Sequence, residues 1–205
     1  MRSCRGASFT APTAGLAPLP ADRASKRMAR ETGFVPLPDG APEPTGAELG
    51  ALVNEFCAAT GAKTVVFQGN GDPLAAVDTV LETVRLVTVE REVRFRLNTL
   101  GLYGHETADA LFLSDAFRPD ARGRVDTLSI FLAAPDAETY ANLLRPKSGD
   151  GFEDVCEFVR RAAATPGIDT IECTAVDRPD VDIAAVEALA MRLGATQFRT
   201  RSFLG

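Results

Sequence analysis

The chain has 205 residues, of which 45% are hydrophobic and 24% charged, as in ordinary globular proteins. Its net charge of −6 argues against a nucleic-acid partner, because neutralising phosphates requires a basic excess. No apolar run approaches the roughly 18 residues that a membrane-spanning helix needs. We therefore expect a globular protein without a nucleic-acid or membrane partner.

Residues 1–44 differ in composition from the rest of the chain. They hold seven of the 13 prolines, and residues 1–30 carry six basic groups against one acid. Proline fixes φ and lacks an amide donor, so neither a helix nor a central strand can run through such a stretch. We expect a basic, flexible arm over 1–44 and one domain over 45–205. An organellar transit peptide is the alternative for the arm.

From Thr45 onward the pattern becomes regular. Thr45 and Glu48 have the spacing of a capping box, and the apolar residues that follow at helical intervals predict a helix ending at Gly61. The β-branched run 64–67 is typical of a buried strand in a parallel sheet. Apolar residues on one face predict a helix over 74–88.

The same alternation of strands and helices continues to the end of the chain. Strands are predicted at 93–99, 127–133, 168–176 and 196–200, and helices at 105–117, 137–144, 152–164 and 183–193. Five strands separated by helices predict an α/β fold of right-handed parallel β/α units. Ligands of such folds bind at the carboxyl ends of the strands.

The most informative loop is Gly69-Asn70-Gly71-Asp72-Pro73, which follows the first predicted strand. Its two glycines permit close backbone approach to a ligand, Asp72 can cap the next helix, and Pro73 suits the first helical position. A capped β/α turn without a ligand explains the same residues. A dinucleotide-binding motif is excluded, because Leu74 stands where its third glycine belongs.

The order of several segments resembles one family. Gly69–Pro73 resembles the Gly-x-Gly-Glu-Pro loop of radical SAM enzymes, which holds the amino group of S-adenosylmethionine. The segments that follow at similar spacing are Arg96–Gly101, Leu128–Pro135, Asp136–Tyr140 with Arg145-Pro146, and Val176–Ile183. Over about residues 62–201 this succession resembles the small radical SAM proteins associated with TatD-type nucleases. The resemblance implies a partial (β/α) barrel that lacks its first strand.

The resemblance also implies two cofactors, S-adenosylmethionine and a [4Fe-4S] cluster, which such enzymes hold by a Cys-x₃-Cys-x₂-Cys loop. Cys4 and the residues after it resemble the last cysteine of that loop. The first two cysteines would then precede Met1; otherwise the cluster site has decayed. The residues implied to bind S-adenosylmethionine are Gly69, Asn70, Gly71, Asp72, Pro73, Asn98 and Arg199, and Cys4 is the implied metal ligand.

Several positions depart from the family pattern. Cys57, Cys156 and Cys173 are far apart, and we expect them to be packed in the interior as small apolar residues. Asp72 stands where the family usually has Glu, and apolar residues replace usual polar ones at 100, 131 and 133. Each lost partner would leave a buried polar group of the cofactor unpaired, at about 1–3 kcal/mol.

Arg199 and Arg201 lie on the same face of the last predicted strand. They can bind a carboxylate or phosphate, with Asp177 and Asp182 expected opposite; a charged edge strand that resists aggregation is the alternative. His105, the only histidine, has no second histidine with which to share a metal.

Two hypotheses for function follow. The first is a radical SAM-like enzyme that reductively cleaves S-adenosylmethionine and acts on an unknown small molecule, if the cluster loop is completed upstream. The alternative is a barrel without a cluster that serves as a ligand-binding or scaffold module. The scattered cysteines and the lack of a secretory signal favour an intracellular, cytoplasmic protein, with organellar targeting left open. An unpaired edge of the first strand could also support self-association.

Overall fold

The fold is built on one parallel sheet. The computed structural model describes residues 44–68, 72–89, 92–146 and 151–203, so the arm predicted for 1–44 lies almost entirely outside the described residues. All neighbouring strands are parallel and follow the order β1-β2-β3-β4-β5. The strands are β1 (Thr64–Phe67), β2 (Val93–Thr99), β3 (Gly123–Phe131), β4 (Thr170–Asp177) and β5 (Gln197–Ser202).

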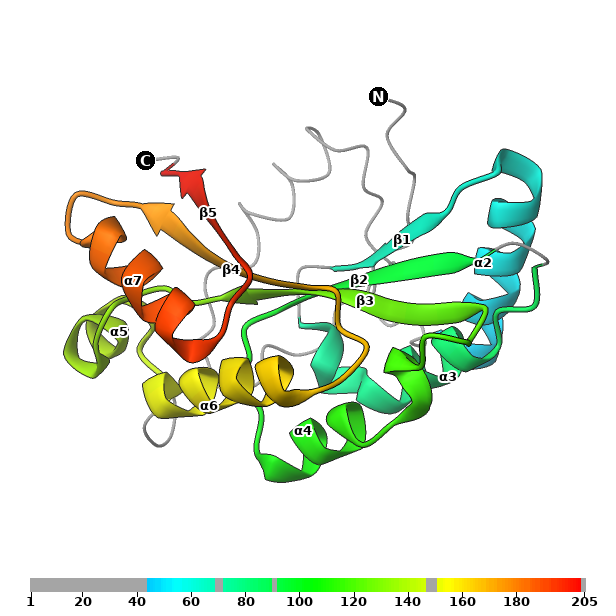
Figure 1. Cartoon of the computed structure of the whole chain (residues 1–205), viewed down its shortest axis with the longest axis horizontal. Coiled ribbons are helices and arrows are strands. Elements are labelled where there is room, and N and C mark those ends of the chain that lie inside the picture. The colour runs from blue at the N-terminus through cyan, green and yellow to red at the C-terminus, as the bar shows by residue number, and fades with distance from the viewer. Residues whose placement is uncertain (1–43, 69–71, 90–91, 147–150, 204–205) are drawn as a thin grey trace.

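Helices connect successive strands and gather on one side of the sheet. In Figure 1, α3, α4, α6 and α7 lie along one side, and no described helix covers the other, which we call the open face. None of the described helices is long and apolar enough to cross a bilayer. The helices are α2 (Gly46–Thr60), α3 (Val77–Arg85), α4 (His105–Phe112), α5 (Ala137–Leu144), α6 (Gly151–Ala164) and α7 (Ile183–Leu193), with 3₁₀ turns η1 (Pro73–Ala76) and η2 (Asp115–Phe117).

Local capping residues mark the ends of α2, α5 and α7. Thr45 and Glu48 form the predicted capping box, and Gly61 ends α2 at φ 72°. Asp136 and Asp182 accept from backbone N–H groups in the first turns of α5 and α7, at 2.8 Å and 3.0 Å. These side chains satisfy N–H groups that have no partner within the helix.

Beyond shifts of a few residues at element ends, the structure departs from the predicted elements in three places. The helix predicted at 74–88 begins as the 3₁₀ turn η1, because Asp72 caps the turn at the Leu74 amide. The helix predicted at 105–117 divides, since the Ser114 side chain accepts from the Ala116 amide and starts η2. Strand β3 begins at Gly123, four residues before the predicted start, because these residues pair with the beginning of β2.

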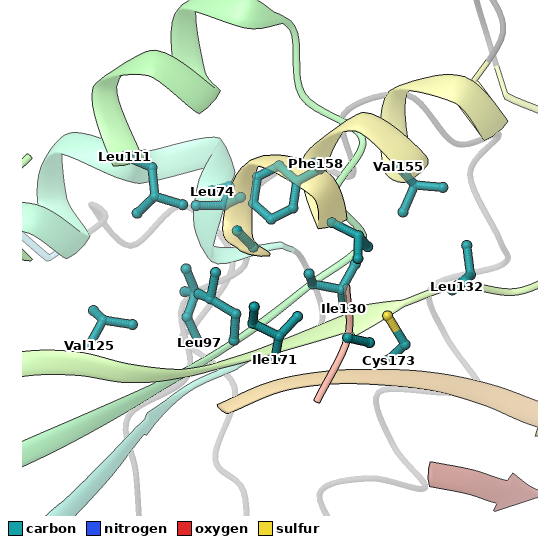
Figure 2. Close-up of a cluster of buried hydrophobic side chains, with 14 of the residues drawn as sticks. Leu74, Leu97, Leu111, Val125, Ile130, Leu132, Val155, Phe158, Ile171 and Cys173 are labelled. Atoms are coloured by element: carbon teal, nitrogen blue, oxygen red, sulfur yellow. The ribbon is translucent and has the colours of Figure 1, made fainter. Parts of the chain in front are cut away.

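The hydrophobic core lies between the sheet and the helices. Figure 2 shows strand side chains such as Leu97 and Ile130 facing Leu111 of α4 and Phe158 of α6. These four side chains are at most 2% exposed. Burying each such side chain contributes about 1.5–3 kcal/mol. The core therefore fixes which face of each strand is turned towards the helices.

The opposite face of the sheet is polar. In β2 the residues Val93, Phe95 and Leu97 are fully buried, whereas the alternating Arg94, Arg96 and Asn98 are not. Side chains alternate between the two faces of a strand, so these three residues belong to the open face. A register shift between Phe95 and Arg96 then brings Asn98 opposite Ser129, which in turn pairs with Glu172.

Candidate ligand-binding site on the open face

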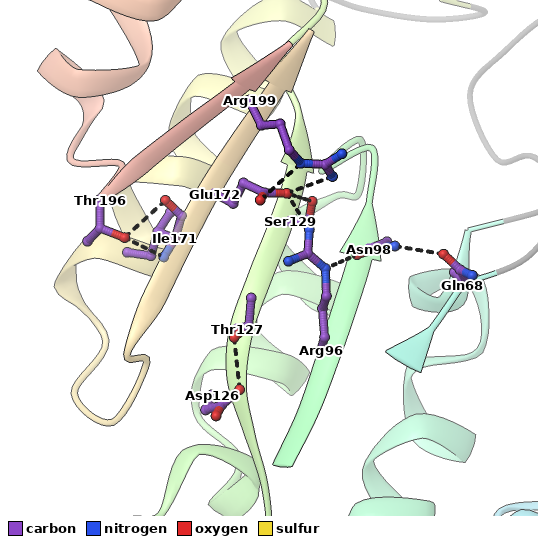
Figure 3. A network of polar contacts seen from close by, with 10 residues as sticks. All are labelled: Gln68, Arg96, Asn98, Asp126, Thr127, Ser129, Ile171, Glu172, Thr196 and Arg199. Atoms are coloured by element: carbon purple, nitrogen blue, oxygen red, sulfur yellow. Dashed lines mark hydrogen bonds and ion pairs between the residues drawn. The ribbon is translucent and has the colours of Figure 1, made fainter. Parts of the chain in front are cut away.

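A polar network crosses the open face from β1 to β5. Figure 3 shows its side chains, with Glu172 of β4 between Arg96 of β2 and Arg199 of β5. The register places Glu172 beside Ser129 on one side and Gln197 on the other. Strand pairing therefore assembles on one surface residues that are far apart in the sequence, from Gln68 to Arg199.

The carboxylate of Glu172 is the centre of this network. It accepts hydrogen bonds from Ser129 Oγ at 2.8 Å, from Arg199 Nη2 at 3.0 Å and Nε at 3.2 Å, and from Arg96 Nη2. Glu172 is only 6% exposed. A buried carboxylate is strongly destabilising unless it is paired and hydrogen-bonded, and here both oxygens have partners.

The arginines around Glu172 determine its ionisation. Burial raises the pKa of Glu172, but hydrogen bonds from Arg199, Ser129 and Arg96 together outweigh it and lower that pKa to about 2. The carboxylate is therefore negatively charged at neutral pH. It holds two guanidinium groups at fixed positions above the sheet.

A second chain of hydrogen bonds joins the network to the loop after β1. Arg96 Nε donates to Asn98 Oδ1 at 2.9 Å, and Asn98 Nδ2 donates to Gln68 Oε1 at 3.0 Å. Gln68 directly precedes the glycine loop. Asn98, which the family resemblance implies as a binding residue, lies on the open face, while Gly69, Asn70 and Gly71 lie outside the described residues.

Asp72 holds the carboxyl ends of β1 and β2 together. Its Oδ2 accepts from Thr99 Oγ1 at 2.8 Å and from the Leu100 amide at 2.6 Å, and its Oδ1 accepts from the Leu74 amide. Burial raises the pKa of Asp72 more than these hydrogen bonds lower it. Both oxygens are thus engaged within the protein, and the buried Pro73 begins η1 next to them.

Arg199 pairs with an acid other than Asp177 and Asp182, the two that were expected opposite Arg199 and Arg201. Asp182 caps α7 through the Ala185 amide, and Asp177 is exposed at the end of β4. The acid that pairs with Arg199 is Glu172 instead. Within the described ranges, Arg201 has no ion pair; burial and the like charge of Arg199 lower its pKa.

The cysteines of the described residues do not face this site. Cys57, Cys156 and Cys173 are all at most 2% exposed, and Cys173 belongs to the core on the helix side of the sheet (Figure 2). Burial, with smaller contributions from Cys156 and Glu172, raises the pKa of Cys173 to about 12. These thiols therefore pack as predicted.

The described residues offer no metal site built from His, Cys, Asp and Glu. Over the parts of the chain that the structure describes, no group of three His, Cys, Asp or Glu residues could hold a metal ion. Cys4 lies outside this part, and His105 is exposed at the start of α4. The described residues thus do not supply the ligands of a [4Fe-4S] cluster, which requires thiolates.

Sequence reasoning missed Glu172, Ser129 and the role of Arg96 in the site. A usable signal was present, because Glu172 is a charged residue between Ile171 and Cys173 in the middle of a predicted strand. Charged residues are almost never fully buried unless paired. A partner on a neighbouring strand was therefore to be expected, but its identity depends on register.

Comparison with known proteins supports the fold. No protein-family model and no curated protein matches the sequence. Among solved structures, HydG, a maturase of the [FeFe]-hydrogenase, is similar with a TM-score of 0.50 and 15% identity, over 78% of this chain and 36% of that chain. This chain thus spans well under half of HydG. A C2-type ketoreductase from a modular polyketide synthase matches at 16% identity, over 93% of this chain and 57% of that chain, but its TM-score of 0.26 supports no shared architecture.

The fold is therefore an open α/β sheet of five parallel strands with helices on one side, similar to part of the HydG fold. This agrees with the fold class predicted from the sequence. The narrower likeness to TatD-associated proteins stays a prediction.

Proposed function

We propose that this chain binds S-adenosylmethionine at the carboxyl ends of its strands, on the open face. The glycine loop 69–73 would contact the amino group of the ligand, and Arg199 its carboxylate. The observation that carries this proposal is the polar network of the open face. It connects Arg199 through Glu172, Arg96 and Asn98 to Gln68, immediately before that loop.

The chemistry of these side chains suits an amino acid-like ligand. A guanidinium presents paired N–H donors that match a carboxylate, and half of the Arg199 side chain remains exposed. The fold resemblance to HydG supports the same location, since parallel α/β folds bind ligands at the carboxyl ends of their strands.

Our proposal is limited to binding. Reductive cleavage of S-adenosylmethionine, the activity that the resemblance implies, requires a cluster held by three thiolates. The described residues offer three cysteines, all buried in the hydrophobic core. We therefore derive no radical step for these residues.

Calorimetric titration of the full chain with S-adenosylmethionine tests this function. We expect saturable binding that Arg199→Ala weakens at least 10-fold, because the ligand carboxylate loses its cationic partner. Arg160→Ala is the matched control, since Arg160 pairs with Glu153 and Glu157 on the exposed side of α6. Absence of saturable binding, or equal weakening by both substitutions, would contradict the proposal.

A further inference from the structure

Two guanidinium groups bind a single carboxylate at the open face, and a third arginine follows on the same face of β5. Arg96 and Arg199 both donate to Glu172. Arg201 lies two residues beyond Arg199 on the same side of β5. Burial and the like charges of Arg199 and Arg96 lower its pKa, and the charge of Glu172 raises it. We call Arg96, Arg199 and Arg201 the arginine cluster. With Glu172 ionised, the four side chains carry a net charge of +2.

Several N–H donors of the arginine cluster have no acceptor among the described residues. Each guanidinium offers five N–H donors. Arg96 uses Nε and Nη2, and Arg199 uses the same two nitrogens. Among the described residues, no acceptor is assigned to either Nη1 or to any nitrogen of Arg201. Several donors are therefore available to one incoming oxyanion.

The position of the cluster also favours a ligand. Arg199 pairs in register with Thr174 and Arg201 with Val176, so the cluster extends towards the carboxyl end of β4. Thr174 belongs to the same face as Glu172, and its buried hydroxyl has no hydrogen-bond partner among the described residues. A bound oxyanion would supply an acceptor beside it.

We propose that the arginine cluster binds a phosphoryl group, as free phosphate or as a phosphate monoester, while Glu172 holds two of its guanidinium groups in position. A phosphoryl dianion would neutralise the net charge of +2, whereas a single carboxylate would leave half of it uncompensated. Arginine forks recognise phosphate through paired hydrogen bonds. S-adenosylmethionine contains no phosphate, so this ligand goes beyond the function proposed above.

Titration of the full chain with inorganic phosphate tests the proposal, with chloride keeping the ionic strength constant. We expect saturable binding by calorimetry and a rise in Tm that chloride alone does not produce. Arg201→Ala should weaken phosphate binding at least 10-fold. This substitution removes no ion pair of the described residues, so the variant should remain folded. Arg118→Ala, which removes an exposed pair with Asp120, is the matched control and should bind phosphate like the wild type.

Two further ligands distinguish the sources of the phosphoryl group. Ethyl phosphate binding at least as tightly as phosphate would support a phosphorylated metabolite, and weaker binding would support free phosphate. Tighter binding of succinate than of either phosphate would overturn the proposal, as would equal effects of Arg201→Ala and Arg118→Ala or no saturable binding. S-adenosylmethionine is absent from these titrations, so their failure is distinguishable from failure of the function proposed above.

Discussion

At the scale of single residues, Glu172 determines how the arginines of the open face are arranged. It is a buried, ionised carboxylate that accepts hydrogen bonds from Arg96, Arg199 and Ser129, and it holds the two like-charged arginines in place. Removing one partner of such a buried arrangement is costly, because the remaining charges lose their compensation. Glu172 thus contributes both to stability and to the geometry of the site.

This role predicts a specific dependence of stability on pH. The pKa of Glu172 falls from its ordinary value of 4.5 to about 2 in the folded protein. Its contribution is therefore complete above about pH 4.5 and is lost as the pH falls towards 2. Glu172→Gln should lower the free energy of unfolding at pH 7 by about 2–3 kcal/mol. In this variant the free energy of unfolding should also decrease less between pH 4.5 and pH 2 than in the wild type.

Urea denaturation at a series of pH values measures this effect. Glu187→Gln, on the exposed side of α7, is the matched control and should keep the wild-type profile. A Glu172→Gln profile parallel to that of the wild type would show that the arginines do not hold this carboxylate.

At the scale of elements, tight backbone contacts position the strands. Gly167, in the connection before β4, has a φ of 91°, and a Cβ placed on it would lie 2.0 Å from the Phe117 carbonyl oxygen. Nearby, Arg124 donates to the Gly167 carbonyl at 2.7 Å and pairs with Asp169. This connection therefore helps to set where β4, and with it Glu172, begins.

Gly167→Ala should destabilise the protein by about 3 kcal/mol or more, because it combines a disfavoured backbone conformation with a steric clash. Gly104→Ala is the matched control: it lies before α4, with no atom within 4 Å of the added Cβ, and should change stability by less than about 1 kcal/mol. Chemical denaturation measures both. Similar losses for the two variants would mean that the contact with Phe117 does not restrict this connection.

Elements whose ends are determined by local residues could be predicted from the sequence. The bounds of α5 and α7 were predicted correctly, since Asp136, Asp182 and Gly194 mark them in the sequence. The early start of β3 could not be predicted, because it depends on pairing with β2 and on the register shift at Phe95. The same shift aligns Asn98 with Ser129, so most of the site could not be predicted from the sequence either.

At the scale of the whole molecule, the two faces of the sheet carry different kinds of side chain. The helix side buries the apolar residues and all three cysteines of the described part, while the open face gathers the charged network (Figure 3). The alternation of strands and helices along the chain predicted the fold class, and the family resemblance implied Arg199 and Asn98 as binding residues. The pairing of Arg199 with Glu172 needed the three-dimensional arrangement.

The central claim is that ligands bind on the open face at the carboxyl ends of the strands. Hydrogen-exchange mass spectrometry of the full chain, with and without S-adenosylmethionine, tests it most directly. Our account predicts slower exchange in the peptides that contain the carboxyl ends of β1, β2 and β5. Slower exchange confined to α4 and α6 on the helix side, or no change anywhere, would contradict it.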